Sequence, residues 1–227
     1  MKQYYKAYED RYKKVHKTTG LAWAGDEPSI ILKDLFEKYS INTSSNILEI
    51  GCGEGQNAIF LLNENYNIVA SDVSPAAIKW CKTKANQAGI LKNRFFVLDI
   101  VKNKHKRTYD CIYSISTLHM LVLDSDRKAF FDFIYNHLNT NGIAIVTSMG
   151  DGEFEKNTSD ITKAFELNER EFNNQIINVA STTCRIVNWE NILAEVKNSN
   201  LQIVDKFVST KISGFNVSMV LILKKNN

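Results

Sequence analysis

One stretch near the start of the chain limits the possible folds more than any other. Residues 47–58 read ILEIGCGEGQNA, in which strand-type apolar residues run into three glycines, Gly51, Gly53 and Gly55. Apolar residues of helical type follow at once. A strand that passes through a glycine-rich turn into a helix presents backbone N–H groups to a ligand, and glycine tolerates the positive φ of such turns. The stretch therefore predicts a ligand-binding turn in an α/β domain.

The spacing of these glycines disfavours two common ligand-binding turns. The dinucleotide fingerprint G-x-G-x-x-G needs glycine at position 56, where the chain has Gln56. The phosphate-binding loop that ends in Gly-Lys-Ser or Gly-Lys-Thr is also absent. A nicotinamide-dependent oxidoreductase on a similar sheet is thus disfavoured, although it stays the competing enzyme class.

The composition is that of an ordinary globular protein. The 227 residues, 44% of them hydrophobic and 23% charged, suit a single domain over residues 1–227, and the net charge of +3 does not by itself indicate nucleic acid. No apolar run is as long as a membrane span, and the N-terminal residues lack the apolar core of a signal peptide. The cysteines Cys52, Cys81, Cys111 and Cys184 follow no metal-ligand spacing, so we expect no metal. Cysteines of this kind suit reduced thiols, so we expect a cytoplasmic protein.

Strands and helices are expected to alternate over residues 46–149. This alternation predicts a doubly wound, mostly parallel sheet with helices on both faces. In such sheets a ligand binds beyond the carboxyl ends of the strands, where the strand order reverses. The strands are expected at residues 47–50, 67–72, 94–99, 109–115 and 142–148.

Two acidic residues stand where two of these strands end. Asp72 closes the second strand, 21 positions after Gly51, and Asp99 closes the third. The first spacing is close to that at which a carboxylate accepts hydrogen bonds from both vicinal hydroxyls of a ribose. The glycine turn, the two acids and the end of the fourth strand should therefore converge on one crevice.

These features together resemble the class I S-adenosylmethionine-dependent methyltransferases. The pattern E-x-G-x-G-x-G, from Glu49 to Gly55, resembles motif I of that family. The two strand-end acids and the stretch YDCIYSISTLHML at residues 109–121 follow at the expected intervals. The resemblance implies a Rossmann-like three-layer sandwich, in which a seven-stranded sheet has an antiparallel last strand.

The same resemblance divides the domain into four parts. Residues 1–40 would form N-terminal cap helices, and residues 46–149 would form the cofactor-binding core. Residues 150–185, which are polar and irregular, would form a substrate cap. Residues 186–227 would supply a closing helix and two strands.

The resemblance also implies how the chain binds S-adenosylmethionine, whose product is S-adenosylhomocysteine. In similar enzymes the glycine turn passes the methionine portion, the second-strand acid holds the ribose and the third-strand acid accepts from the adenine amino group. Backbone at the end of the fourth strand meets the methionine ammonium. Trp23 could close over the ligand or anchor the core. The expected cofactor contacts are Trp23, Glu49, Gly51, Cys52, Gly53, Gly55, Asp72, Val73, Ser74, Asp99, Ile100, Ser114 and Ile115.

His119 is the candidate catalytic residue. A sulfonium methyl is already electrophilic, so such a protein mainly aligns a nucleophile behind the S–CH₃ bond. A base is needed only when the nucleophile carries a proton at working pH. Similar enzymes often place a histidine at the edge of the substrate pocket, where His119 would stand. Alternatively, this histidine only hydrogen-bonds a neighbour or contacts the cofactor.

The N-terminal segment carries an aromatic stripe. One face of a predicted helix over residues 1–17 holds Tyr4, Tyr5, Tyr8, Tyr12 and Val15. Three interpretations stay open: a docked helix, a lid over the active site, and a basic helix on a membrane surface. Arg185 could hold a substrate carboxylate or form a surface ion pair. The expected substrate contacts are Tyr4, Tyr8, Tyr12, His119 and Arg185.

The expected function is methyl transfer to an oxygen, nitrogen or sulfur atom of a small molecule. The chain has only two prolines, Pro28 and Pro75, so it lacks the Asn/Asp-Pro-Pro-aromatic motif and the Pro-Cys nucleophile of several nucleic-acid and protein methyltransferases. An RNA methyltransferase is an alternative because of the basic run at residues 102–107, which we interpret as a solvated loop. A non-catalytic S-adenosylmethionine-binding protein is the other alternative, and the oligomeric state stays open.

Overall fold

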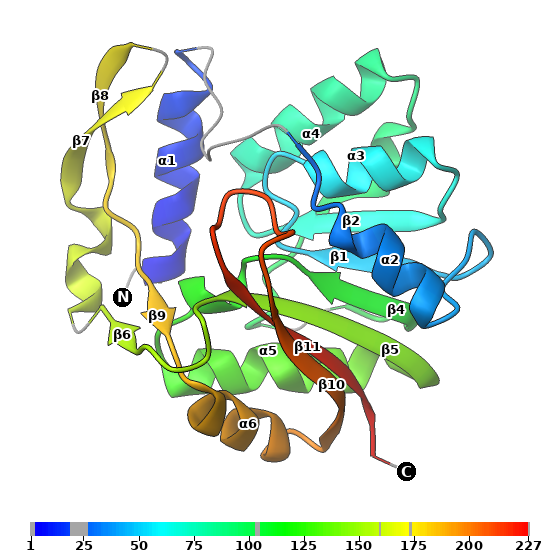
Figure 1. The fold of residues 1–227 in the computed structure, drawn as a ribbon. Coiled ribbons are helices and arrows are strands. Elements are labelled where there is room, and N and C mark those ends of the chain that lie inside the picture. Colours follow the sequence, from blue (N-terminus) through cyan, green and yellow to red (C-terminus); the bar gives the residue numbers. More distant parts are fainter. Residues whose placement is uncertain (1–2, 19–26, 103–104, 159, 173, 227) are drawn as a thin grey trace.

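The computed structural model describes residues 3–18, 27–102, 105–158, 160–172 and 174–226. Its centre is a seven-stranded sheet with the order β10–β11–β5–β4–β1–β2–β3 (Figure 1). The strands of this sheet are β1 Ile47–Ile50, β2 Ile68–Asp72, β3 Phe95–Val97, β4 Tyr109–Ser114, β5 Leu138–Met149, β10 Leu201–Ser209 and β11 Ser218–Lys225. The α-helices are α1 Ala7–Val15, α2 Ile31–Lys38, α3 Gln56–Asn63, α4 Pro75–Gln87, α5 Asp124–His137 and α6 Trp189–Lys197.

The direction of the strands confirms the predicted fold class. β1 pairs in parallel with β2 and β4, β2 pairs in parallel with β3, and β4 pairs in parallel with β5. β11, the last strand of the chain, lies between β5 and β10 and is antiparallel to both. The sheet is thus mostly parallel, with one antiparallel strand.

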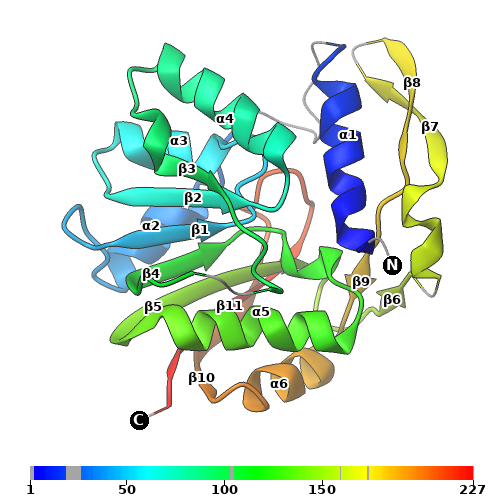
Figure 2. The ribbon, with the colours of Figure 1, turned by 180° about the vertical axis from the view of Figure 1, so that it is seen from behind.

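The core lies in two layers, one on each face of the sheet. Successive side chains of a strand point to opposite faces, so Leu48 and Ile50 pack with α5 and α6, whereas Ile47 packs with α2, α3 and α4. Figure 1 shows α2 in front of the sheet, and Figure 2, seen from the opposite side, shows α5 in front of the other face. The strands read as apolar runs because both faces are covered.

The N-terminal segment starts with a 3-10 turn, η1 Tyr4–Lys6, and continues as α1. The five apolar side chains of the predicted stripe are all buried. The second helix, α2, begins at Ile31, three residues after Pro28. The backbone N–H of Ser29 donates to Asn57 Oδ1 at 2.8 Å, which ties the chain to α3 before α2 begins.

Residues 150–185 contain two short sheets that the sequence did not reveal. β6 Lys156–Asn157 pairs with β9 Arg185–Ile186, and β7 Leu167–Phe172 pairs with β8 Gln175–Ala180. Figures 1 and 2 both show the β7–β8 hairpin beside α1, away from the main sheet. Nearly every side chain of β7 is exposed, so its sequence lacks the alternation by which a half-buried strand is recognised.

Candidate functional site

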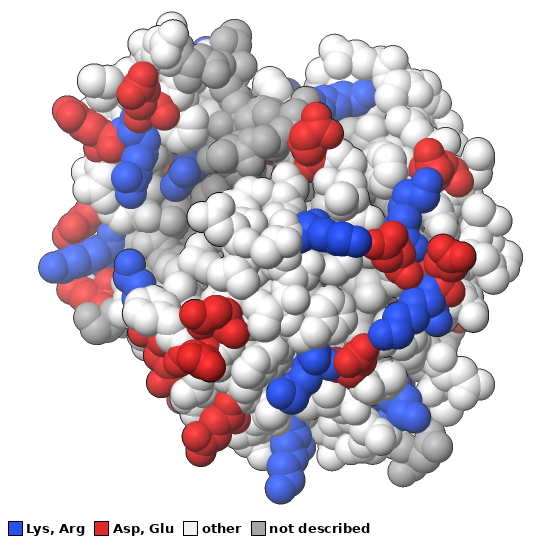
Figure 3. All heavy atoms as spheres, in the orientation of Figure 1, with Lys and Arg blue, Asp and Glu red and all other residues white. Residues whose placement is uncertain are grey.

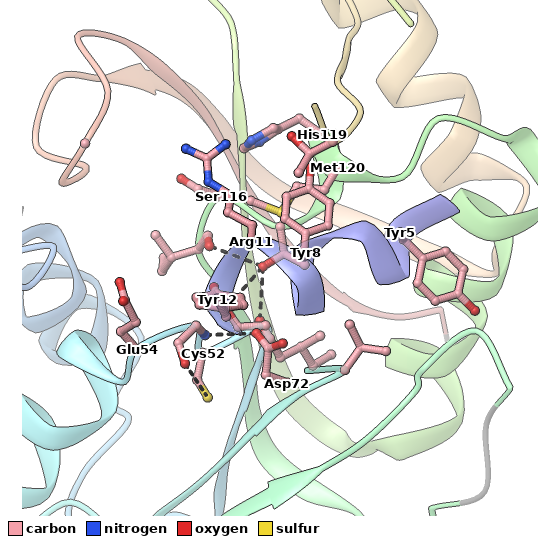
Figure 4. Close-up of a pocket in the computed structure, with 18 of the residues that line it drawn as sticks. Tyr5, Tyr8, Arg11, Tyr12, Cys52, Glu54, Asp72, Ser116, His119 and Met120 are labelled. Atoms are coloured by element: carbon pink, nitrogen blue, oxygen red, sulfur yellow. Dashed lines mark hydrogen bonds between the residues drawn. The ribbon is translucent and has the colours of Figure 1, made fainter. Parts of the chain in front are cut away.

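The carboxyl ends of β1 to β4 face one cavity of about 630 Å³. The cavity lies where the strand order reverses, since β1 has β2 on one side and β4 on the other. Open α/β sheets bind ligands at this position. α1 and the β7–β8 hairpin provide the opposite wall, with Tyr8 and Tyr12 from the helix and Phe172 from β7. Figure 4 shows this helix passing beside the glycine turn and the residues that follow β4.

The glycine turn follows β1 directly. Gly51 and Gly53 have φ values of 71° and 53°, in the left-handed region that favours glycine. A Cβ on Gly51 would lie 2.1 Å from Thr117 Oγ1, so only glycine lets the turn approach the end of β4. The packing therefore brings two chain segments together and leaves bare backbone facing the cavity.

Asp72 stands at the end of β2 beside that turn. Its Oδ2 accepts from the backbone N–H of Gly53 at 3.0 Å, and its Oδ1 accepts from the N–H of Ser74 at 2.8 Å. These two bonds fix the carboxylate, while its remaining lone pairs stay available to hydroxyl donors. Burial raises the pKa of Asp72 to about 6. The carboxylate is thus charged at neutral pH and protonated in mild acid.

Asp99 follows β3, and its carboxylate contacts residues of η1, the turn before α1. The Tyr5 hydroxyl contacts both carboxylate oxygens, at 3.2 and 3.3 Å, and Lys6 Nζ lies 3.6 Å from Oδ2. Burial, together with the charge of Asp99, raises the pKa of Tyr5, so Tyr5 is the donor in this contact. A ligand group that donates to Asp99 must replace the tyrosine or share the acid with it.

Glu49 lies in β1 beneath the cavity. It is buried, and the Tyr113 hydroxyl donates to its Oε2 at 3.1 Å. Burial raises the pKa of Glu49 to about 8, so this carboxyl is mainly protonated at neutral pH. It stabilises the base of the glycine turn as a neutral group.

Polar side chains of three residues fasten α1 across the cavity. Glu9 accepts from the Ser74 hydroxyl and from the N–H of Ala76 at 3.0 Å, at the N-terminus of α4. His16 Nε2 lies 2.7 Å from Glu54 Oε1 in the glycine turn. The Tyr8 hydroxyl donates to the carbonyl of Thr183 at 2.7 Å. The sequence revealed the apolar stripe but not these long-range bonds, and α1 both docks on the domain and covers the cavity.

His119 lies in the 3-10 turn η3 Leu118–Met120, which follows β4. Its Nδ1 accepts from the backbone N–H of Met149 at 3.3 Å. Its ring meets the Phe215 ring edge-on, with centroids 5.4 Å apart. Burial, with the charge of Arg127 as a second cause, lowers the pKa of His119 to about 4. The imidazole is therefore neutral throughout the physiological range.

Most of the predicted site residues come together at the cavity, and five do not. The predicted residues that line it are Tyr8, Tyr12, Glu49, Gly51, Cys52, Gly53, Asp72, Val73, Asp99, Ile100, Ile115 and His119. The predicted residues that lie outside this lining are Tyr4, Gly55, Ser74, Ser114 and Arg185. Trp23 lies outside the described residues.

Tyr4 and Arg185, both predicted to contact substrate, meet at Val122. The Tyr4 hydroxyl accepts from the Val122 N–H at 3.0 Å, and Arg185 donates to the Val122 carbonyl at 3.0 Å. Arg185 also forms an ion pair with Asp124, which is the second of its two predicted roles. Ser114 is buried and donates to the carbonyl of Ile50 at 3.0 Å.

The sequence missed several residues of the cavity wall. Met120 lies within the stretch 109–121, and the others come from segments that no motif connects: Tyr5, Arg11, Met149, Phe172, Thr183 and Phe215. The aromatic stripe was the only signal for one of them, Tyr5. Among the described residues, no group of three or more histidine, cysteine or acidic side chains is placed to hold a metal ion. A metal-free reaction stays a prediction.

Known proteins resemble the chain in sequence and in fold. Residues 47–142 match the family described as "Methyltransferase domain". The chain is 30% identical over 138 residues to the malonyl-acyl-carrier-protein O-methyltransferase of Bacillus anthracis, covering 60% of this chain and 49% of the relative. It is 24% identical over 119 residues to the ubiquinone biosynthesis O-methyltransferase of Rickettsia canadensis, covering 52% and 49%. The chain thus spans about half the length of these relatives.

Solved structures share the fold. An S-adenosylmethionine-dependent methyltransferase from Clostridium acetobutylicum ATCC 824 has a TM-score of 0.68 at 18% identity, over 88% of this chain and 91% of that chain. The glycopeptide N-methyltransferase MtfA in complex with S-adenosylmethionine has a TM-score of 0.64 at 13% identity, over 90% and 89%. At such identities the likeness concerns the fold alone.

Proposed function

We propose that this chain, which belongs to the class I S-adenosylmethionine-dependent methyltransferases, transfers the methyl group of that cofactor to an oxygen, nitrogen or sulfur atom of a small molecule. The observation that carries the proposal is the convergence of the glycine turn, Asp72 and Asp99 on one cavity at the strand-order reversal. This donor and acceptor set fits a nucleoside joined to an amino acid. Both O- and N-methyltransferases occur among the similar proteins.

When bound, the cofactor supplies an electrophilic methyl group on a sulfonium sulfur. Asp72 would accept from the ribose hydroxyls, held in place by its two backbone bonds. Asp99 would accept from the adenine amino group once the Tyr5 hydroxyl has moved. Gly51 and Gly53 would let the backbone approach the methionine portion. α1 and the β7–β8 hairpin would keep water from the reacting atoms.

A small acceptor suits the described surface better than RNA does. Figure 3 shows Lys and Arg interspersed with Asp and Glu over one face of the molecule. Lysines form pairs that span different elements, among them Lys38 with Asp205 at 2.8 Å and Lys211 with Asp34 at 2.9 Å. RNA binding depends on cations that are available to phosphates. The acyl-carrier protein in one relative's name makes a carrier-bound acceptor a variant of the same proposal.

A location is proposed on separate grounds. The described cysteines are free thiols, which is typical of reducing compartments, and we propose the cytoplasm. No described helix combines the length and the apolar composition that crossing a membrane requires.

The test is methyl transfer from methyl-radiolabelled S-adenosylmethionine into fractionated cell extract, with Asp72→Asn as the binding-deficient control and Asp34→Asn as the surface control. Label in the small-molecule fraction, lost in Asp72→Asn but kept in Asp34→Asn, supports the proposal. Label confined to RNA would favour the alternative substrate. Tight binding of S-adenosylhomocysteine without any transfer would indicate a non-catalytic binder.

A further inference from the structure

Ser116 and His119, from the segment after β4, line the cavity at one end. Figure 4 shows Ser116, His119 and Met120 at this end and Asp72 and Cys52 at the other. Asp72 and Cys52 belong to the expected cofactor contacts. The end with Ser116 and His119 is therefore where an acceptor would meet the cofactor, and the chemistry of these two residues limits what the acceptor is.

The hydrogen bond from Met149 fixes the protonation of the His119 ring. A neutral imidazole has one accepting nitrogen and one N–H. Since Nδ1 accepts from the backbone N–H of Met149 at 3.3 Å, the proton of His119 lies on Nε2. The His119 side chain is 4% exposed and lines the cavity. His119 therefore offers the cavity a donor and no lone pair.

A buried cation beside η3 opposes protonation of this ring. Arg127 is fully buried in α5 and donates to the carbonyls of Leu118 and Leu121, at 3.0 and 3.2 Å, on either side of His119. A second positive charge in this place would be repelled, in line with the low pKa of His119. The ring is thus a poor acceptor of a proton from substrate.

Ser116 supplies a second donor. Its φ is 55°, uncommon for a residue with a side chain, and its N–H donates to Thr147 Oγ1 at 2.9 Å, which holds this conformation. Its hydroxyl oxygen is buried and has no hydrogen-bond partner among the described residues. A buried hydroxyl without a partner is costly, so a ligand atom that accepts from it would be bound favourably.

The carboxylates of the cavity wall are poorly suited to replace His119 as a base. Asp72 and Asp99 belong to the cofactor end and accept from backbone N–H groups and from Tyr5. Glu54 contacts His16. Burial raises the pKa of Glu49 to about 8, so it is mainly protonated at neutral pH. Glu27 and Glu171 are exposed, and a solvated carboxylate is a weak base.

We propose that His119 and Ser116 bind the methyl acceptor as hydrogen-bond donors, and that the acceptor is a carboxylate, which can accept from both donors and still keep a free lone pair on oxygen at neutral pH. This inference rests on the proposed methyl transfer. The acceptor's lone pair forms the bond to the methyl carbon, and the electrons of the broken C–S bond stay on sulfur. A carboxylate gives a neutral methyl ester, so no proton leaves. Alcohols and phenols, which must lose one, are disfavoured.

The first test is the tautomer of His119 at neutral pH, measured by NMR on protein labelled with ¹⁵N-histidine. The chain has four histidines, and the signal that disappears in His119→Gln assigns the resonance. A proton on Nε2 with an unprotonated Nδ1 supports the proposal. A proton on Nδ1, or on both nitrogens, would overturn it. Binding of S-adenosylhomocysteine to the same sample tests the proposed function separately.

The second test compares acceptors, with aromatic probes because Met120, Met149 and Phe215 make this end of the cavity apolar. Benzoate is matched against phenol and benzyl alcohol, and labelled methyl transfer is measured. An amide N–H can replace the Nε2 donor but cannot take a proton, so His119→Gln should lower kcat/KM for benzoate less than tenfold. His119→Phe removes the donor and should lower it about tenfold or more. Transfer to phenol or benzyl alcohol that His119→Gln abolishes would overturn the proposal, since a general base contributes roughly 100-fold or more.

Discussion

Replacing Arg127 by alanine should destabilise the fold more than any surface change on the same helix. The guanidinium is fully buried, and its Nε and Nη2 atoms lie 2.8 to 2.9 Å from the carboxylate of Glu195 in α6. It also donates to two carbonyls of the turn around His119. Its removal should cost about 3–5 kcal/mol, because it leaves a cavity, leaves the two carbonyls without their donor and takes from Glu195 its nearest cation.

The assay is reversible urea and thermal unfolding followed by circular dichroism. A loss of 3–5 kcal/mol corresponds to a fall in Tm of roughly 10 °C for a domain of this size. The matched control is Lys128→Ala, the neighbouring residue of α5, whose exposed pair with Asp132 at 2.6 Å should contribute no more than about 0.5 kcal/mol.

A double variant tests whether the pair itself carries the effect. Arg127→Met combined with Glu195→Met should lose less free energy of unfolding than the sum of the two single variants, by about 1–3 kcal/mol, since neither charge remains unpaired. The reasoning would be refuted if Arg127→Ala destabilised the chain no more than Lys128→Ala does.

Two further predictions concern the cofactor end. Burial raises the pKa of Asp72 to about 6. The affinity for S-adenosylhomocysteine should therefore be constant above pH 7 and weaken up to about tenfold per pH unit as the pH falls below 6. Calorimetry on wild type should show this slope, and a similar slope in Asp72→Asn would contradict the prediction. Tyr5→Phe should bind S-adenosylhomocysteine about tenfold more tightly, because a hydrogen bond to the charged Asp99 no longer has to be broken; weaker binding would mean that the tyrosine contacts the ligand instead.

The cofactor half of the site was predictable because its determinants are local in sequence. Gly51 follows directly after β1, and Asp72 and Asp99 stand at or just after the ends of β2 and β3. A parallel sheet with short connections brings such strand ends to one edge whatever the rest of the chain does. Their shared position around one cavity therefore follows from strand order alone.

The contacts of η1 and α1 were not predictable, because they join residues far apart in the chain. Tyr5 and Asp99 are 94 positions apart, and Glu9 and Ser74 are 65 apart. The tyrosine stripe predicted a buried face but gave no indication of its partner. Only the folded chain shows that Tyr5 occupies the acid expected to bind adenine.

The acceptor half was least predictable. β7 has the polar sequence LNEREF with exposed side chains, so its pairing with β8 left no alternating pattern. The donor role inferred for His119 depends on the N–H of Met149, at the end of β5 and 30 positions away. The sequence could place a histidine near the pocket but could not reveal its tautomer.

The most direct test of the central claim is calorimetric binding of S-adenosylhomocysteine, with NADH as the competing ligand, to wild type, Asp72→Ala and the surface control Asp34→Ala. Two hydrogen bonds from the ribose to a charged acceptor are together worth about 3 kcal/mol, so Asp72→Ala should bind about 100-fold more weakly while Asp34→Ala is unchanged. Wild type should not bind NADH measurably. Preference for NADH, or binding of S-adenosylhomocysteine that does not depend on Asp72, would contradict the account.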